Sequence, residues 1–433
     1  MSKSNPSATT VQNRWWADRL YKLVLRQNLT REDARKAWNL LWEEWTKLDI
    51  RLLKSRYLPE KLRVLLAFRK LDPLALMIAP TFLVGLTAKG MTPQELAGLV
   101  DSFLDHGWFR EYESYELPSP DIVYSNGFGG DAIKTINVST GAMIIAAAAG
   151  APCYKMGSRT YFSESGSHDF LEIVGVKACT TPEHTLQTLR QAGLAYIDGV
   201  ATADAPTQGI GTGLSVMPGA KELMKMMTYP FRFPILCLNP LKPRLSVRGV
   251  STLDTEASAE VLRSYYPYTE RFEITAGTTS DGSVIDEVSN VGSTKITEYR
   301  DGELRTYLTT PADWGVRESH PRDIRSGDPW MSAVKILAIL RGICHDAHKD
   351  LLLINASQFL YVAGKVHSRK DGTEMARAAV DDGRALEKLR AWVQASGGKE
   401  GAFEMMVAAA AREDQSERMR HPLMLGQAPS ESQ

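Results

Sequence analysis

The sequence has few of the features that mark secreted or nucleic-acid-binding proteins. It contains only 4 cysteines in 433 residues, too few and too scattered for a disulfide framework. Lysine plus arginine equals aspartate plus glutamate, at 51 each, so no overall charge attracts the chain to nucleic acid or to an anionic membrane. Any anion-binding site must therefore be local.

Long apolar runs are also missing. The amino-terminal stretch has no continuous apolar segment of the kind found in signal peptides. The most apolar stretches, 74–85 and 142–151, are shorter than the ~20 residues that a membrane-spanning helix needs. With 43% hydrophobic and 24% charged residues, the composition is that of a globular protein with two or three domains' worth of core. We predict a cytoplasmic protein with reduced thiols.

The first hundred residues carry helical patterns. Thr30 precedes an apolar-periodic stretch and is followed three positions later by Asp33, a weak form of the N-terminal capping pattern. Trp38, Trp42 and Trp45 then fall on one face of a helix. We interpret this tryptophan stripe as core or dimer packing rather than as a ligand site.

A second helix is predicted between Thr92, as its N-cap, and Gly107, with Glu95 completing a capping box. From Asp121 onward, short apolar runs alternate with helical stretches, which is typical of an α/β sheet domain. The predicted fold class is α/β with a helical domain, in which an N-terminal helical bundle packs on a larger α/β domain with a central mixed sheet.

A glycine-rich segment follows the first predicted strand. Residues 127–131 read Gly-Phe-Gly-Gly-Asp, and Asn137, Ser139 and Thr140 follow soon after. Such a turn between a strand and a helix lets backbone N–H groups point at one anion, and the later side chains add donors. Taken alone, the segment is explained equally well by an ordinary tight turn. It is neither a Walker A loop nor a dinucleotide fingerprint.

Two further stretches carry groups suited to a phosphate-rich ligand. Lys155 and Arg159 lie either side of a glycine, and a serine-rich run ending at Ser167 follows; cations and hydroxyls of this kind bind phosphate, although an exposed polar loop has the same composition. Asp286 and Glu287 are adjacent carboxylates. Hard oxygen ligands of this kind suit Mg²⁺ shared with substrate phosphates, but adjacent acids are also common on surfaces.

In order, these stretches resemble the anthranilate phosphoribosyltransferase family. That family has Gly-Thr-Gly-Gly-Asp, Asn-x-Ser-Thr, Lys-His-Gly-Asn-Arg, Gly-Ser-Ala-Asp-x-Leu-Glu and Leu-Asp-Glu-x-Ser segments. The corresponding segments here are 127–131, 137–140, 155–159, 166–172 and 285–289. The resemblance covers most of the chain, with extra material near 47–75 and at both ends.

The resemblance implies a glycosyltransferase (a pentosyltransferase) that binds phosphoribosyl pyrophosphate in a cleft between a helical and an α/β domain, usually as a homodimer. The donor- and pyrophosphate-binding residues are then expected to be Gly127, Phe128, Gly129, Gly130, Asp131, Asn137, Ser139, Thr140, Lys155 and Ser167. Magnesium would be held by Ser139, Asp286 and Glu287.

The same resemblance divides the chain into four segments. In order, we expect a disordered N-terminus, a helical domain, an α/β domain that binds the donor, and a disordered tail, at 1–12, 13–110, 111–411 and 412–433. The insertion near 47–75 and later helices near 205–230 are assigned to the helical domain.

The departures from the family lie mainly on the acceptor side, which by residue match comprises Met156, Gly157, Ser158 and Met226. Met156 and Ser158 stand where the family has histidine and asparagine. Met226 stands where the family has an arginine that binds the anthranilate carboxylate, and losing such a charge-assisted pair costs ~1.5–3 kcal/mol. Phe128 replaces the threonine of the glycine loop. We therefore expect an acceptor other than anthranilate.

The predicted function is Mg²⁺-dependent transfer of a phosphoribosyl group to an aromatic or heteroaromatic acceptor, with release of pyrophosphate. Three alternatives remain: a genuine anthranilate phosphoribosyltransferase of tryptophan biosynthesis, a non-enzymatic nucleic-acid-binding paralogue and a nucleoside phosphorylase. The balanced charge and the lack of a dense lysine and arginine stripe count against nucleic acid. The adjacent Asp286 and Glu287 favour the transferase over the phosphorylase.

Overall fold

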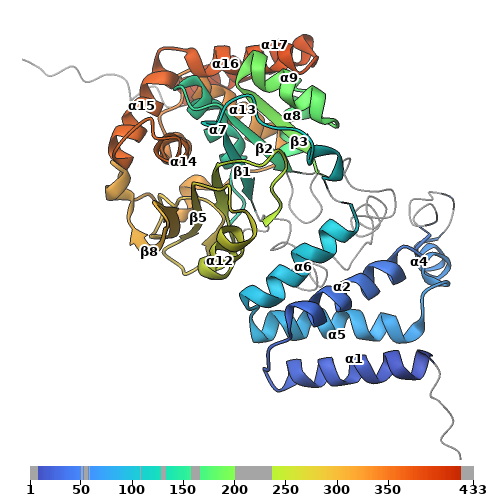
Figure 1. Ribbon diagram of the computed structural model, residues 1–433. Coiled ribbons are helices and arrows are strands. Elements are labelled where there is room, and N and C mark those ends of the chain that lie inside the picture. The colour runs from blue at the N-terminus through green and yellow to red at the C-terminus, as the bar shows by residue number, and fades with distance from the viewer. Residues whose placement is uncertain are drawn as a thin grey trace, which may run out of the picture.

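The structure is a computed structural model that describes residues 8–49, 52, 57, 59–107, 109–127, 133–157, 166–199 and 237–420. A helical region formed by the N-terminal part of the chain lies on one side of a larger α/β region (Figure 1). The helices of the N-terminal region are α1 (Ala8–Val24), α2 (Arg31–Trp45), α4 (Glu60–Phe68), α5 (Pro73–Lys89) and α6 (Pro93–Asp105). The predicted combination of a helical bundle with an α/β domain is confirmed.

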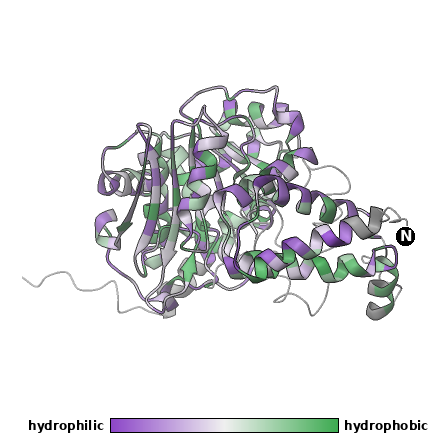
Figure 2. Ribbon diagram, turned by 60° about the horizontal axis from the view of Figure 1, so that its bottom comes forward, coloured by the Kyte–Doolittle hydropathy of each residue, from purple (hydrophilic) through white to green (hydrophobic). Residues whose placement is uncertain are grey.

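Helix α2 begins where the capping pattern predicted. The Thr30 hydroxyl accepts a hydrogen bond from the backbone N–H of Asp33 at 3.0 Å, which satisfies one of the donors left free at a helix start. Trp38 and Trp42 are buried, and Trp45 packs against both rings edge to face. Of the two interpretations of the tryptophan stripe, core or dimer packing, these contacts support core. Figure 2 shows both hydrophilic and hydrophobic residues on the helices of this region, and α2 buries one apolar face, which includes Trp38 and Trp42.

Helix α6 starts with the predicted capping box. The Thr92 hydroxyl accepts from the N–H of Glu95, whose carboxylate accepts from the N–H of Thr92 at 2.8 Å. The same buried carboxylate accepts from the N–H of Leu29 at 2.8 Å and pairs with Lys89 at 2.8 Å. A residue that caps its own helix therefore also joins α6 to the loop before α2 and to the end of α5.

Within the described residues, the α/β region is built on one mixed sheet of eight strands. Its order is β3-β2-β1-β4-β5-β7-β8, with β6 pairing on β5. The pairs from β3 to β5 are parallel, and those from β5 to β8 are antiparallel. The strands are β1 (Val123–Gly127), β2 (Cys153–Gly157), β3 (Leu194–Asp198), β4 (Leu245–Gly249), β5 (Arg271–Thr278), β6 (Val284–Ile285), β7 (Thr294–Arg300) and β8 (Glu303–Thr309).

In the described part of the chain, two apolar cores cover the two faces of the sheet. One lies between the sheet and helices of the α/β region, and the other joins the opposite face to the N-terminal helices. The helices of the α/β region are α7 (Val138–Ala148), α8 (Ser167–Ile173), α9 (Pro182–Ala192), α12 (Thr255–Tyr265), α13 (Pro329–Leu340), α14 (Ala347–Val362), α15 (Arg369–Asp381), α16 (Arg384–Ala395) and α17 (Glu400–Arg420). Helix α12 contacts α6, which joins the two regions.

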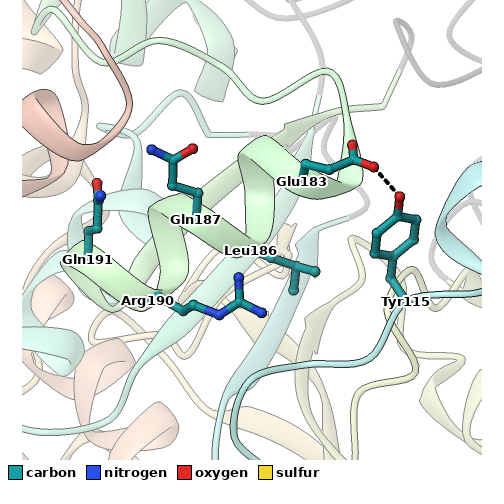
Figure 3. A pocket seen from close by; sticks show the side chains of 6 residues that line it. All are labelled: Tyr115, Glu183, Leu186, Gln187, Arg190 and Gln191. Carbon is teal, nitrogen blue, oxygen red and sulfur yellow. Dashed lines mark hydrogen bonds between the residues drawn. The ribbon is translucent and has the colours of Figure 1, made fainter.

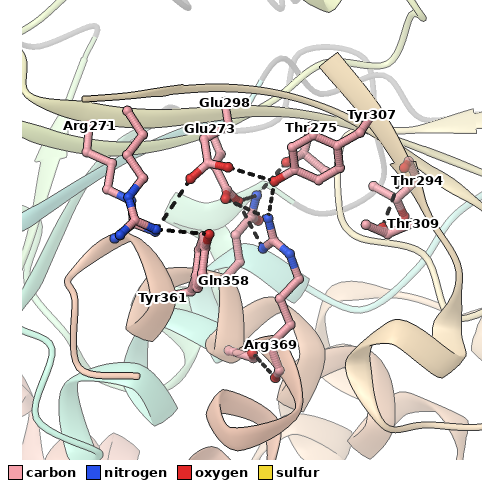
Figure 4. Close-up of polar contacts among 12 residues, drawn as sticks. Arg271, Glu273, Thr275, Thr294, Glu298, Tyr307, Thr309, Gln358, Tyr361 and Arg369 are labelled. Carbon is pink, nitrogen blue, oxygen red and sulfur yellow. Dashed lines mark hydrogen bonds and ion pairs between the residues drawn. The ribbon is translucent and has the colours of Figure 1, made fainter. Parts of the chain in front are cut away.

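A buried polar network anchors α14 and α15 to the sheet (Figure 4). The Arg369 guanidinium pairs with the Glu273 carboxylate of β5 at 2.7 Å and donates to the Tyr307 hydroxyl of β8 at 2.6 Å. The Gln358 amide of α14 donates to Glu273 at 2.9 Å. Because these side chains are buried or nearly buried, each depends on its hydrogen bonds to the others to offset the free-energy cost of leaving water.

Where the structure describes the ends of the chain, at 8–12 and 412–420, they are helical, in contrast to the disorder expected within 1–12 and 412–433. Helix α1 already begins at Ala8, and α17 continues to Arg420. Glutamate, glutamine, arginine and methionine are frequent after position 412, and these residues are good helix formers even where they are polar. Part of the expected insertion at 47–75 forms α4. The later helices expected near 205–230 lie outside the described residues.

The structure also describes the state of the cysteines and the character of the helices. Cys153, Cys179, Cys237 and Cys344 are all free thiols. In the described ranges, no helix combines the length and the apolar character needed to cross a bilayer.

Candidate active site

The parallel part of the sheet has a point at which the direction of chain crossover reverses. From β1, the sheet continues through β2 and β3 on one side and through β4 and β5 on the other. Between β1 and β4, Gly127 lies opposite Gly249 at the carboxyl ends of both strands. Open α/β sheets bind ligands outside the carboxyl ends of their strands at such a switch point.

The two predicted metal carboxylates lie at this switch point. A side chain at Gly249 would overlap the backbone carbonyl of Asp286, and a methyl group at Gly127 would lie 2.8 Å from the Asp286 carboxylate. A side chain at Gly277, near the end of β5, would overlap the carbonyl of Glu287. The segment that carries both acids can therefore cross the strand ends only because these three positions lack a Cβ.

Lys155 of β2 extends toward the start of α7, which follows the glycine-rich segment. Its ammonium donates to the Ser139 hydroxyl at 2.6 Å and to the Thr140 hydroxyl at 3.4 Å. Both hydroxyl residues lie in the first turn of α7, whose N-cap is Asn137. The free N–H groups and the dipole of a helix N-terminus favour an anion, so a cation and a helix start are brought together here.

The carboxylates of Asp286 and Glu287 attract the charge of Lys155. Burial lowers the pKa of the Lys155 ammonium, while attraction to Asp286 and Glu287 acts in the opposite direction. Residues that are far apart in sequence therefore share one electrostatic environment at the switch point. In such an arrangement the ammonium can bind a phosphate group while the neighbouring carboxylates bind a divalent cation.

Ser167 is brought to the same edge of the sheet as the first residue of α8. The Asp169 carboxylate accepts from the Gly166 N–H at 2.9 Å, and His168 lies 3.4 Å from the Asp198 carboxylate at the carboxyl end of β3. Asp198 in turn lies opposite Gly157, the last residue of β2. Ser167 thus lies near the carboxyl ends of β2 and β3. Between these two described residues, Ser167 and Lys155, there is no hydrogen bond.

Met156 lies on the other face of the sheet. Because side chains alternate along a strand, Lys155 faces α7, whereas Met156 is 2% exposed and packs in the core shared with the helical region. A side chain at Gly199 would lie 3.0 Å from its Cγ. The described contacts of Met156 are therefore those of a core residue. Of the other predicted site residues, Phe128, Gly129, Gly130, Asp131, Ser158 and Met226 lie outside the described residues.

The side chains at the switch point fit magnesium. Asp286 and Glu287 supply carboxylate oxygens, and Ser139 supplies a hydroxyl close to Lys155. Within the described part of the chain, no group of three or more histidine, cysteine, aspartate or glutamate residues could hold a metal ion. Mg²⁺ often takes only one or two carboxylates and completes its coordination with waters and substrate phosphates. The donor set therefore suits a metal that binds together with a phosphate ligand.

A surface hollow of about 500 Å³ lies elsewhere, along α9 (Figure 3). Its lining residues are Tyr115, Glu183, Leu186, Gln187, Arg190 and Gln191. The Tyr115 hydroxyl donates a hydrogen bond to the Glu183 carboxylate, so this carboxylate already has a partner within the hollow. None of the predicted site residues that the structure describes lines this hollow.

Several residues that shape the site are not among those expected from the sequence. Gly249 and Gly277 are needed for close approach, and Asn355 of α14 contacts the backbone next to Glu287. A glycine at the end of each apolar run, in "SVRGV" and "ITAGT", was the available signal for the first two. Nothing in the sequence around Asn355 indicates its partner.

Comparisons with known proteins show what this chain is similar to. Residues 119–386 match the profile described as "Glycosyl transferase family, a/b domain". Anthranilate phosphoribosyltransferase from Methanosarcina acetivorans is 32% identical over 312 residues, covering 71% of this chain and 78% of that protein. The Shewanella oneidensis protein of the same name is 32% identical over 307 residues, covering 71% and 84%.

Solved structures of anthranilate phosphoribosyltransferases share the fold of this chain. Anthranilate phosphoribosyltransferase from Saccharomyces cerevisiae in complex with PRPP and Mg has a TM-score of 0.67 at 21% identity, covering 88% of this chain and 98% of that one. The Thermus thermophilus structure has a TM-score of 0.62 at 21% identity, covering 87% and 98%. From the matched profile, the sequence relatives and the shared fold, we conclude that this chain belongs to the anthranilate phosphoribosyltransferase family of glycosyltransferase enzymes.

Proposed function

We propose that this protein is a cytoplasmic homodimeric enzyme that uses Mg²⁺ to transfer the phosphoribosyl group of phosphoribosyl pyrophosphate to a small aromatic acceptor. The observation that carries the proposal is the convergence of Lys155, the start of α7 and the carboxylates Asp286 and Glu287 at the switch point. The names of the relatives and the yeast complex with PRPP and Mg support the same donor and metal.

Each group has a separate part in this reaction. Displacing pyrophosphate builds positive charge on the sugar and negative charge on the leaving group. Asp286, Glu287 and Ser139 would hold magnesium, which when bound stabilises the charge on the leaving pyrophosphate. Lys155 and the N–H groups of α7 would bind phosphate oxygens. The bond from Lys155 to Ser139 keeps the ammonium at this position before any ligand arrives, which reduces the reorganisation required in the transition state.

The names of the relatives favour anthranilate as the acceptor, and we propose it as the first acceptor to test. The second candidate, an aromatic or heteroaromatic acceptor other than anthranilate, is favoured by the sequence at Met226, which stands where the family has the arginine that binds the anthranilate carboxylate. A methionine cannot form that charge-assisted pair. The two candidates therefore differ in the polar groups that the acceptor must carry.

A pyrophosphate-release assay separates the candidates. The protein is supplied with phosphoribosyl pyrophosphate and Mg²⁺, and then with anthranilate or with a panel of aromatic amines, carboxylates and azoles. Turnover of anthranilate, with the phosphoribosylated product identified by mass spectrometry, would establish the first candidate; turnover of another acceptor alone would establish the second. If calorimetry detects no binding of phosphoribosyl pyrophosphate with Mg²⁺, the transferase proposal is rejected.

Binding of inorganic pyrophosphate is expected to weaken as the pH rises. The loss should occur at a lower pH than the deprotonation of an ordinary lysine, whose pKa is ~10.4. Burial lowers the pKa of Lys155; above that pKa the amine is neutral and no longer attracts phosphate oxygens. Titration calorimetry in Mg²⁺ from neutral pH to about pH 10 measures the change. The control is Lys155→Arg, which stays charged throughout; an equally steep decline in that variant would assign the pH dependence to another group.

The homodimer is proposed to form through the outer face of α1 and α5. Tyr21 and Val24 of α1 and Met77 and Val84 of α5 are all exposed, and a groove of about 520 Å³ separates the two helices. Exposed apolar patches of this kind mark interaction sites. Light scattering should show that Met77→Glu combined with Val84→Glu converts the dimer to a monomer, whereas Leu308→Glu, at an exposed apolar position on β8, leaves it intact. A monomeric wild-type protein would contradict this proposal.

A further inference from the structure

Helix α14 carries one buried amide that contacts the segment of Asp286 and Glu287. Asn355 is 4% exposed. Its Oδ1 accepts a hydrogen bond from the backbone N–H of Val288 at 2.9 Å, and its Nδ2 donates to the carbonyl of the same residue at 3.0 Å. A further hydrogen bond joins Nδ2 to the Leu351 carbonyl of α14 at 2.8 Å. The side chain therefore pairs with both polar groups of one residue, as a neighbouring β-strand would.

The backbone that Asn355 holds is the one that orients the carboxylates. The N–H of Val288 belongs to the peptide group that directly follows Glu287, so Oδ1 fixes the plane of that peptide group. Before the acids, Val284 and Ile285 pair with β5 as β6. The acids are thus held on the strand ends from one side by β6 and from the other by Asn355.

We propose that Asn355 is a positioning residue, which sets the orientation of Asp286 and Glu287 for a divalent cation without touching the cation or the substrate. This inference depends on the proposed function. Residues that orient metal ligands typically change metal affinity by ~10–100-fold when they are replaced. The amide is suited to this part because it carries a donor and an acceptor side by side, which leucine or alanine lacks.

Gln358 provides a matched control on the same helix. Its side chain is 2% exposed, and its amide donates to Glu273 of the buried polar network rather than to the 286–289 segment (Figure 4). Replacing either amide removes buried hydrogen bonds from α14, so both variants should lose stability. Only the Asn355 variant should also lose metal affinity.

The experiment compares Asn355→Leu and Gln358→Leu with the wild-type protein. Urea unfolding measures stability, and electron paramagnetic resonance measures binding of Mn²⁺, alone and with inorganic pyrophosphate. We expect Asn355→Leu to bind Mn²⁺ about 10-fold or more weakly, and Gln358→Leu to bind it as the wild type does. Transfer by Asn355→Leu should recover as Mg²⁺ is raised, because a weakened site is filled again by mass action.

The outcomes separate the inference from the proposed function. If the wild type binds Mn²⁺ and Asn355→Leu binds it equally well, Asn355 is only structural and the inference is overturned. Equal losses of affinity in both leucine variants would also overturn it. If the wild type binds no Mn²⁺ with or without pyrophosphate, the proposed function fails and the inference fails with it. If Asn355→Leu does not fold, Asn355→Thr, whose hydroxyl can hold only one of the two contacts to Val288, takes its place with a smaller expected loss.

Discussion

Replacement of Asp286 and Glu287 by their amides is expected to lower kcat/KM for phosphoribosyl transfer by about 10³-fold, because a bound metal contributes several kcal/mol of charge stabilisation and ~4 kcal/mol corresponds to that factor. The amides keep the size of the side chains but lose the negative charges that attract Mg²⁺. The variant also leaves the buried Lys155 without its acidic neighbours, so some loss of stability is expected beside the loss of activity. The measurement is steady-state pyrophosphate release at saturating Mg²⁺, with stability followed by urea unfolding.

The control for this double variant is Asp281→Asn. Asp281 is an exposed acid shortly before Asp286, and its carboxylate accepts from the N–H of Ser283 at 3.1 Å within its own turn. Its replacement should leave kcat/KM close to the wild-type value. If the double amide variant kept full activity, or if Asp281→Asn lost as much, the carboxylates at the switch point would not be the metal ligands.

The second large effect is expected at Gly249, where alanine should reduce both stability and activity. The new Cβ would overlap the carbonyl of Asp286 and lie 3.0 Å from its Cβ, so the acidic segment must move away from the strand ends. Overpacking of this kind costs ~1–3 kcal/mol, and a shift of ~1 Å in a catalytic group can cost ~10²-fold in rate. Urea unfolding and pyrophosphate release measure the two losses separately.

Gly327→Ala is the matched control for this substitution. A Cβ at Gly327 meets nothing within 4 Å, and its φ lies outside the left-handed region. Its replacement should change neither stability nor activity appreciably. A Gly249→Ala variant as stable and active as Gly327→Ala would show that the segment of Asp286 does not lie on the end of β4.

Gly249 and Asn355 act on the same segment from different elements. The glycine leaves room for the Asp286 backbone, and the asparagine fixes the peptide group that follows Glu287. Substituting either one should displace the carboxylates without removing a charge. Weaker metal binding that excess Mg²⁺ restores would therefore be their common signature, in contrast to the double amide variant, which added metal should not rescue.

The sequence by itself determined the local structure and the family. Thr30 and Thr92 were recognised as helix caps because the groups that pair lie three residues apart, a distance that sequence spacing reads directly. The period of the tryptophan stripe matches a helix and indicates packing, in the core or a dimer, and two of its tryptophans are buried in the structure. The order of short motifs around Lys155, Ser167 and Asp286 was sufficient to identify the family, since each motif is a contiguous run.

Only the tertiary structure decided which of these residues meet. Lys155 and Asp286 are more than a hundred residues apart in the chain, and the parallel pairing of β2, β1 and β4 brings them to one edge of the sheet. The strand register places Met156 in the core on the opposite face from Lys155. The close approach at Gly249 and the contact of Asn355 with Val288 depend on strand order and helix packing. Such contacts between distant segments leave no periodic trace in the sequence, because they are set by the pairing of elements and not by the spacing of residues along the chain.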